Sequence, residues 1–196
     1  MDALTHAVEA YTNRFCFPKA KKASELAVKL IYENLMTAYE NGSDILAREK
    51  MLLASYYAGV AINNNFIGYV HAIAHGIGGV YGVTHGKANA IVLPYVMEAF
   101  GKSAEKKLAD LAELVSLKGI ENATVEEKAK AFIQSLRDFN EKLAIPDKIE
   151  ELKKDDFPTL VDRALNEGNP TYPVPTIWGK EEFEEVLTRL NNVKSF

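Results

Sequence analysis

The spacing of hydrophobic residues along this chain is helical over most of its length. Between Pro18 and Gly42, apolar residues recur every three or four positions: Ala23, Leu26, Ala27, Leu30 and Ile31. This spacing puts them on one face of a helix. Proline is typical of the first helical turn and glycine of the position after the last one. The pattern therefore predicts one helix from after Pro18 to near Gly42.

A second helix is predicted to begin at a cap formed by Ser43 or Asp44. Its apolar residues lie on all sides, which favours a central position in the fold. They are Leu52, Leu53, Tyr56, Tyr57 and Val60. The stretch 51–86 has no charged side chain, but asparagines, histidines and glycines interrupt it. A pair of buried core helices is therefore a better interpretation of this stretch than a membrane span.

Further helices are predicted in the second half of the chain. A helix through Leu108 and Val115 stops at Gly119, and Thr124-x-x-Glu127 is a capping-box pattern that opens the next one. Two more helices are expected at 156–168 and 183–190, and Pro146 ends the one before them. We find no alternating strand pattern and no repeat. The prediction is an all-α fold, a multi-helix bundle that forms a single domain over residues 1–196.

Composition narrows the class of protein. The 196 residues are 47% hydrophobic and 26% charged, with a net charge of −4 and the basic residues dispersed. A nucleic-acid-binding surface normally needs clustered Lys and Arg, so nucleic acid is not expected as a partner. The N-terminus carries acidic residues where a secretory signal has basic ones, and the single cysteine allows no internal disulfide. We expect a cytoplasmic protein without membrane association.

Candidate chemistry lies in two histidine clusters. Asp2 and His6 are four residues apart, as are His71 and His75, and His85 follows a short turn. A carboxylate with several imidazoles suits Fe(II), Zn(II) or another first-row ion. Alternatively, Asp2 caps a helix, His6 is a surface residue and the later histidines bond to backbone carbonyls. Spacing leaves open whether His75 or His85 completes the set.

Glycines 76, 78, 79 and 82 follow the second cluster. They continue a helical pattern and so are not a dinucleotide fingerprint, which needs a preceding strand. Ala72, Gly76 and Gly79 would form a bare helix face. That face suits close packing against another helix, or the approach of a flat ligand to His75.

Two segments carry a resemblance to a known family. Residues 1–11, MDALTHAVEAY, and 71–94, HAIAHGIGGVYGVTHGKANAIVLP, closely resemble the two signature segments of the iron-containing (group III) alcohol dehydrogenases. Asn169-Pro170 resembles a later element of that family. The resemblance implies a dehydroquinate synthase-like C-terminal helical domain.

The same resemblance implies roles for individual residues. The metal ligands would be Asp2, His6, His71 and His85. His75 would stand beside the metal as a catalytic residue, acting in proton relay or in ordering the nicotinamide and the substrate. With Gly76 and Gly79, His75 would also contact the cofactor.

The implied activity is interconversion of primary alcohols and aldehydes by hydride transfer, with NAD or NADP and with Fe(II) or Zn(II). In the family an N-terminal α/β nucleotide-binding domain precedes these motifs. This chain begins at the first expected ligand, so we expect the catalytic half of such an enzyme, truncated, metal-binding and inactive without its nucleotide domain. A homo-oligomer is compatible with this.

Two alternative functions are to be distinguished from this one. One is a non-catalytic helical module for metal binding or assembly. The other is a helical metal hydrolase, against which the sequence lacks His-Glu-x-x-His and Glu-x-x-His patterns.

Overall fold

The computed structural model describes residues 1–191, and the all-α prediction is confirmed there. Within this range the one β-type pairing is an isolated parallel bridge between Ile149 and Asn191. No helix among these residues is both long and apolar enough to cross a bilayer. The helices are α1 (Asp2–Thr12), α2 (Pro18–Glu40), α3 (Ile45–Asn65), α4 (Tyr69–Tyr81), α5 (His85–Phe100), α6 (Lys102–Leu114), α7 (Val125–Lys142), the short 3-10 helix η1 (Lys154–Asp156), α8 (Phe157–Gly168) and α9 (Lys180–Leu190).

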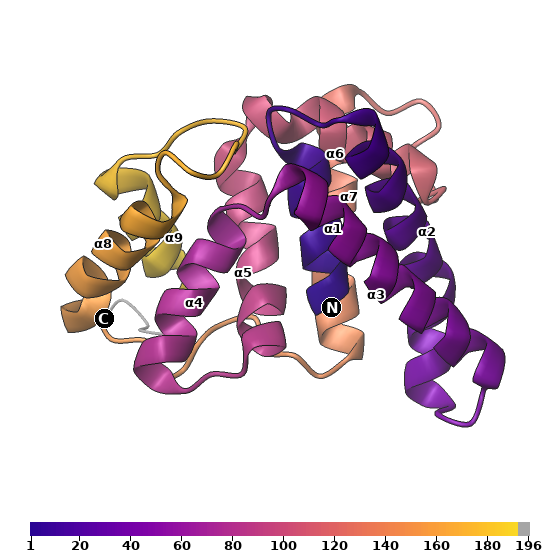
Figure 1. Ribbon diagram of the computed structural model, residues 1–196, viewed down its shortest axis with the longest axis horizontal. Coiled ribbons are helices and arrows are strands. Elements are labelled where there is room, and N and C mark those ends of the chain that lie inside the picture. Colours follow the sequence, from indigo (N-terminus) through magenta and orange to yellow (C-terminus); the bar gives the residue numbers. More distant parts are fainter. Residues whose placement is uncertain (192–196) are drawn as a thin grey trace.

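The helices form one elongated bundle (Figure 1). Helices α2 and α3 make a long antiparallel hairpin at one end, and α1 packs against both. At the other end α8 packs on α4 and on α9. Between these groups, α4 and α5 pack on each other, and α5 also contacts α1, α7 and α9. The N-terminal helix therefore lies beside the middle of the bundle.

Local signals set several of the helix boundaries. Asp44 caps α3, because its Oδ1 accepts a hydrogen bond from the backbone N–H of Ala47 at 2.9 Å. Thr124 and Glu127 form the predicted capping box at the start of α7. Gly82 ends α4 in the left-handed region, with φ of 69°, which glycine adopts without steric cost.

The prediction that the second helix is central was wrong. In α3 the residues that pack inward are small, chiefly Ala54, Ala58 and Ala61. Large apolar side chains on the other face are exposed, Leu52 at 74% and Tyr56 at 65%. Alanines allow close approach of α3 to its neighbours, so the helix occupies the periphery in spite of its apolar composition.

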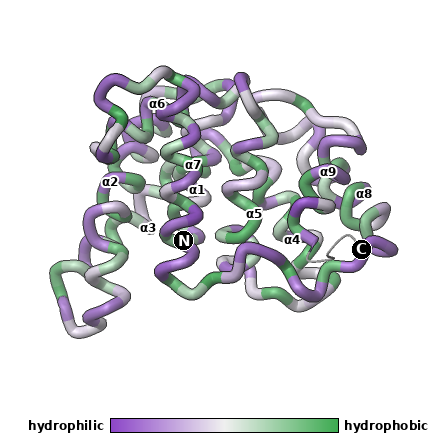
Figure 2. Tube along the Cα trace, turned by 180° about the vertical axis from the view of Figure 1, so that it is seen from behind, coloured by the Kyte–Doolittle hydropathy of each residue, from purple (hydrophilic) through white to green (hydrophobic). Residues whose placement is uncertain are grey.

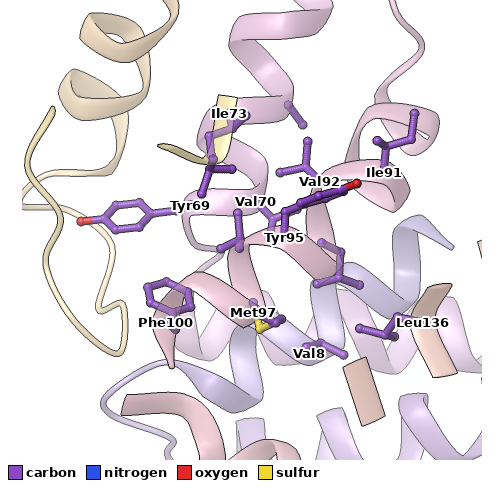
Figure 3. Close-up of a cluster of buried hydrophobic side chains, with 14 of the residues drawn as sticks. Val8, Tyr69, Val70, Ile73, Ile91, Val92, Tyr95, Met97, Phe100 and Leu136 are labelled. Atoms are coloured by element: carbon purple, nitrogen blue, oxygen red, sulfur yellow. The ribbon is translucent and has the colours of Figure 1, made fainter. Parts of the chain in front are cut away.

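Many of the buried core residues lie on α4 and α5. Hydrophobic residues are concentrated along these two helices in Figure 2. Figure 3 shows Val70 of α4 close to Tyr95 of α5, while the ring of Tyr69 points to the other side. There Tyr69 packs against Phe100, Trp178 and Phe183. Burial of apolar side chains contributes about 25 cal/mol for each Å² removed from water. We infer that this cluster makes the N-termini of α4 and α5 firm supports for polar side chains.

Helix α5 contains a proline whose structural cost is offset by another helix. Pro94 has no backbone N–H, so the carbonyl of Ala90 lacks its usual helical donor. Asn140 of α7 donates from Nδ2 to that carbonyl at 2.7 Å, in a buried position. The contact ties α7 to α5, and it explains how a buried helix accommodates the proline.

Candidate metal centre

Four of the predicted site residues come together at the junction of three helices. Asp2 and His6 lie on α1, His71 on the first turns of α4, and His85 begins α5. One ligand-type atom from each residue lies within 4.8 Å of those from the other three. His71 is buried, Asp2 and His6 are partly buried, and His85 is exposed. The arrangement is a half-open cluster with one side toward solvent.

The donor set fits a first-row divalent ion. Four ligands about 2.1 Å from one ion in a tetrahedral arrangement lie about 3.4 Å from one another, so ligand atoms up to 4.8 Å apart would move closer by up to about 1.4 Å on metal binding. Three nitrogens and one carboxylate are suited to iron or zinc rather than to calcium or magnesium. That these four residues bind a metal stays a prediction, which their convergence supports.

Asn89 provides an independent sign that this cluster suits a cation. Its Nδ2 lies 2.7 Å from Asp2 Oδ1, 3.1 Å from His71 Nε2 and 3.1 Å from His85 Nε2. An amide nitrogen has two hydrogens, so at most two of these three acceptors can receive an unshared hydrogen bond. The Asn89 Oδ1 is buried without a hydrogen-bond partner among the described residues. A shared cation would satisfy all of the converging lone pairs together.

At three of the four positions the pKa shift favours the protonation state that binds a metal, which is a neutral imidazole or an ionised carboxylate. Burial lowers the pKa of His6 and also that of His85, which favours neutral imidazoles. At Asp2 burial opposes ionisation, but the Asn89 hydrogen bond and the nearby histidines outweigh it and lower the pKa. At His71 burial is outweighed by the charge of Glu9, so its pKa is raised.

Glu9 was missed by the sequence reasoning, although it contacts the cluster directly. Its Oε2 is 2.5 Å from His71 Nδ1, and its Oε1 accepts a hydrogen bond from the Val70 N–H at 2.7 Å. Asp2, His6 and Glu9 are spaced i, i+4 and i+7, which places them on one face of α1. That spacing was a signal the sequence offered.

His75 is close to the four-residue group but is not part of it. Its ring stacks on that of His85, with centroids 5.2 Å apart. Its Nδ1 is 2.8 Å from Glu167 Oε1, and the same oxygen accepts a hydrogen bond from the Tyr172 hydroxyl. Sequence reasoning also missed Glu167, which is 92 residues away in the chain.

The two glycines predicted to contact a cofactor have different surroundings. Gly76 is buried, and a Cβ built on it would lie 3.4 Å from Leu160 of α8. Gly79 is exposed, with Arg163 3.4 Å from such a Cβ. Gly76 therefore serves the close packing of α4 on α8, and a cofactor role for either glycine stays a prediction.

The fold and the site geometry define a class of protein: a helical domain in which one carboxylate and three imidazoles converge. The model of the Fe-containing alcohol dehydrogenase family, C-terminal part, matches residues 1–190. The chain therefore belongs to the Fe-containing alcohol dehydrogenase family and contains its C-terminal domain. The expectation drawn from the two signature segments is confirmed.

Named relatives agree with this assignment. The 1,3-propanediol dehydrogenase of Klebsiella pneumoniae is 43% identical over 173 residues, covering 86% of this chain and 44% of that protein. The NAD-dependent methanol dehydrogenase of Bacillus methanolicus is 40% identical over 172 residues, covering 85% of this chain and 44% of that protein. A crystal structure of 1,3-propanediol oxidoreductase superposes with a TM-score of 0.91 at 37% identity. The superposition covers 97% of this chain and 50% of that one. The chain thus spans about half the length of these relatives.

Proposed function

We propose that this chain is the metal-binding, catalytic half of an NAD(P)-dependent alcohol dehydrogenase that interconverts primary alcohols and aldehydes. The observation that carries the proposal is the convergence of Asp2, His6, His71 and His85 in a chain of the iron-containing family. Relatives named for propanediol and methanol oxidation support small alcohols as the substrate class.

The ion would be held by these four residues, with Fe(II) as the expected metal and Zn(II) as the alternative. Polarisation of an alcohol or carbonyl oxygen is the chemistry that such an ion supplies. The exposed side of the cluster, next to His85, is where a substrate oxygen could approach. Binding of NAD or NADP is expected to require a nucleotide-binding domain in cis, because the glycines of α4 continue a helix and do not form a phosphate loop.

His75 is the residue that we assign to proton transfer. Glu167 holds its Nδ1, which leaves Nε2 free to take up or release a proton. The side chain is 41% exposed, so it can exchange that proton with water. Its stacking on His85 keeps the imidazole beside the four-residue group.

The ligand assignment is tested by anaerobic titration of the metal-free chain with Fe(II) and Zn(II). We expect one ion per chain, lost in His85→Ala and retained in His75→Ala. Retention in His85→Ala, or loss in His75→Ala, would contradict the assignment. If the wild-type chain binds no ion, the proposed metal centre is wrong.

The activity is tested by reconstitution. The chain by itself should not oxidise 1,3-propanediol or butanol with NAD or NADP, and addition of a separately expressed nucleotide-binding half should restore turnover. Robust oxidation by the isolated chain would refute the need for a second domain. Metal binding without turnover in any combination would favour a non-catalytic metal-binding or assembly module.

A further inference from the structure

We propose that Glu9 is the positioning residue of this metal centre: it keeps a proton on Nδ1 of His71, so that the Nε2 lone pair faces the other three ligands. The inference rests on the proposed metal centre and adds to it a residue outside the ligand set.

The geometry of His71 shows which nitrogen faces which partner. Nδ1 points to Glu9, and Nε2 lies 3.1 Å from the Asn89 amide that also contacts Asp2 and His85. A carboxylate accepts hydrogen bonds and cannot donate one, so the proton between Glu9 and His71 belongs on the imidazole. Protonated at Nδ1, a neutral His71 has its free lone pair at Nε2, which is the atom that would bind the ion.

The second oxygen of Glu9 fixes the helix that carries His71. The Val70 N–H is in the first turn of α4, where helical donors have no intrahelical acceptor. Gly68, the N-cap residue of α4, supplies no side-chain cap, and Glu9 of α1 accepts the hydrogen bond instead. A negative charge at a helix N-terminus is also favourable. One carboxylate therefore sets α4 against α1, the helix that carries Asp2 and His6.

Burial makes this contact specific. Glu9 and His71 are each about 1% exposed, so water cannot replace either partner. The backbone at Gly68 comes so close that a Cβ there would be 2.8 Å from Glu9 Oε1. A buried carboxylate is costly unless its oxygens are satisfied, and here both are. The negative charges of Asp2 and Glu9 would together balance the two positive charges of a divalent ion.

The test replaces the carboxylate by an amide and uses a matched pair elsewhere as control. In Glu9→Gln the amide oxygen can still accept from Val70, while the amide nitrogen then donates to His71 Nδ1 and moves the ring proton to Nε2. Glu167→Gln makes the same change at the exposed His75, outside the ligand set. Zn(II) affinity, measured against a competing chelator, should fall about 10- to 100-fold in Glu9→Gln. It should be unchanged in Glu167→Gln.

A second readout needs no metal. Nitrogen-15 NMR of the histidine rings, with chelator present and at a pH where they are neutral, should find Nδ1–H on His71 in the wild-type chain. It should find Nε2–H in Glu9→Gln. An unchanged tautomer with unchanged affinity overturns the proposal. If the wild-type chain binds no ion, the proposed function fails, yet the tautomer still decides whether Glu9 directs His71.

A further variant applies if Glu9→Gln does not fold. Gly68→Ala retains the carboxylate but crowds it through the added methyl group. Weaker Zn(II) binding by the folded Gly68→Ala chain is the expected result. Wild-type affinity in a folded Gly68→Ala chain whose His71 has lost its Nδ1–H would contradict the role of Glu9.

Discussion

Two histidine–glutamate pairs in this domain have the same hydrogen bond and very different surroundings. In each pair a glutamate oxygen lies next to the imidazole Nδ1, at 2.5 Å for Glu9 and His71 and at 2.8 Å for Glu167 and His75. The side chains of the first pair are 1–2% exposed, and those of the second are 30% and 41% exposed. The two pairs therefore share a carboxylate–imidazole hydrogen bond and differ in their exposure to solvent.

The difference explains why we assign the two histidines different roles. A buried pair has no water to take over its hydrogen bonds, so its ring orientation and proton position are fixed. An exposed pair is screened by solvent and contributes little to stability, but it can exchange protons. His71 is thus suited to be a fixed metal ligand, and His75 to be a group that moves protons.

The largest expected effect on stability comes from removing the buried carboxylate, with removal of the exposed one as the comparison. Glu9→Leu leaves the Val70 N–H and His71 Nδ1 without their buried acceptor, and should lower the free energy of unfolding of the metal-free chain by about 3 kcal/mol. Glu167→Leu should cost less than about 1 kcal/mol. Urea unfolding of both variants measures the difference. Equal losses would show that burial does not distinguish the pairs.

A smaller effect is expected from adding a methyl group beside the buried pair. Gly68→Ala should destabilise the fold by about 2 kcal/mol, because its Cβ would meet the Glu9 carboxylate. Gly76→Ala is the matched control on the same helix, where the contact with Leu160 is ordinary and alanine favours the helix. Thermal unfolding should therefore give a lower midpoint temperature for Gly68→Ala than for Gly76→Ala. A lower midpoint for Gly76→Ala than for Gly68→Ala would contradict this packing argument.

The smallest effect tests a carboxylate of intermediate exposure. Glu98 is held by Arg137 and Arg189, and although burial opposes ionisation, these arginines lower its pKa. Glu98→Gln should cost about 1 kcal/mol near pH 7, a value limited by solvent screening.

The pH dependence of that cost has a defined sign. A lowered folded-state pKa gives stability that is present above the ordinary value near 4.5 and is lost as the pH falls through the folded-state pKa. Unfolding of the wild type and Glu98→Gln, compared from pH 7 to pH 3, should converge at the acid end. A gap that widens on acidification would mean that the arginines do not stabilise the ionised form.

The sequence predicted those features of the fold that depend on near neighbours. The cap at Ser43 or Asp44 and the capping box of Thr124 and Glu127 each involve residues within a few positions of one another, and the structure selects Asp44 for the first. Helical periodicity was likewise sufficient for the all-α class. The position of α3 was not predictable in this way, because the choice between its alanine face and its larger apolar face depends on how α1 and α2 pack.

The candidate site was predictable to a similar degree. Motif resemblance selected His85 over His75, a choice that spacing had left open, and the structure places His85 in the converging group. The supporting carboxylates were not found, because Glu9 and Glu167 meet their histidines across 62 and 92 residues of chain. Asn89, four residues after His85, could have been suspected from its helical spacing alone.

X-ray absorption of the Zn(II)-loaded chain tests the central claim most directly, because it counts the imidazoles bound to the ion. We predict three imidazoles and one carboxylate in the wild type, the same count in His75→Ala, and one imidazole fewer in His71→Ala. A fourth imidazole in the wild type, or one lost in His75→Ala, would show that the exposed histidine is a ligand and contradict the division of roles between the two pairs.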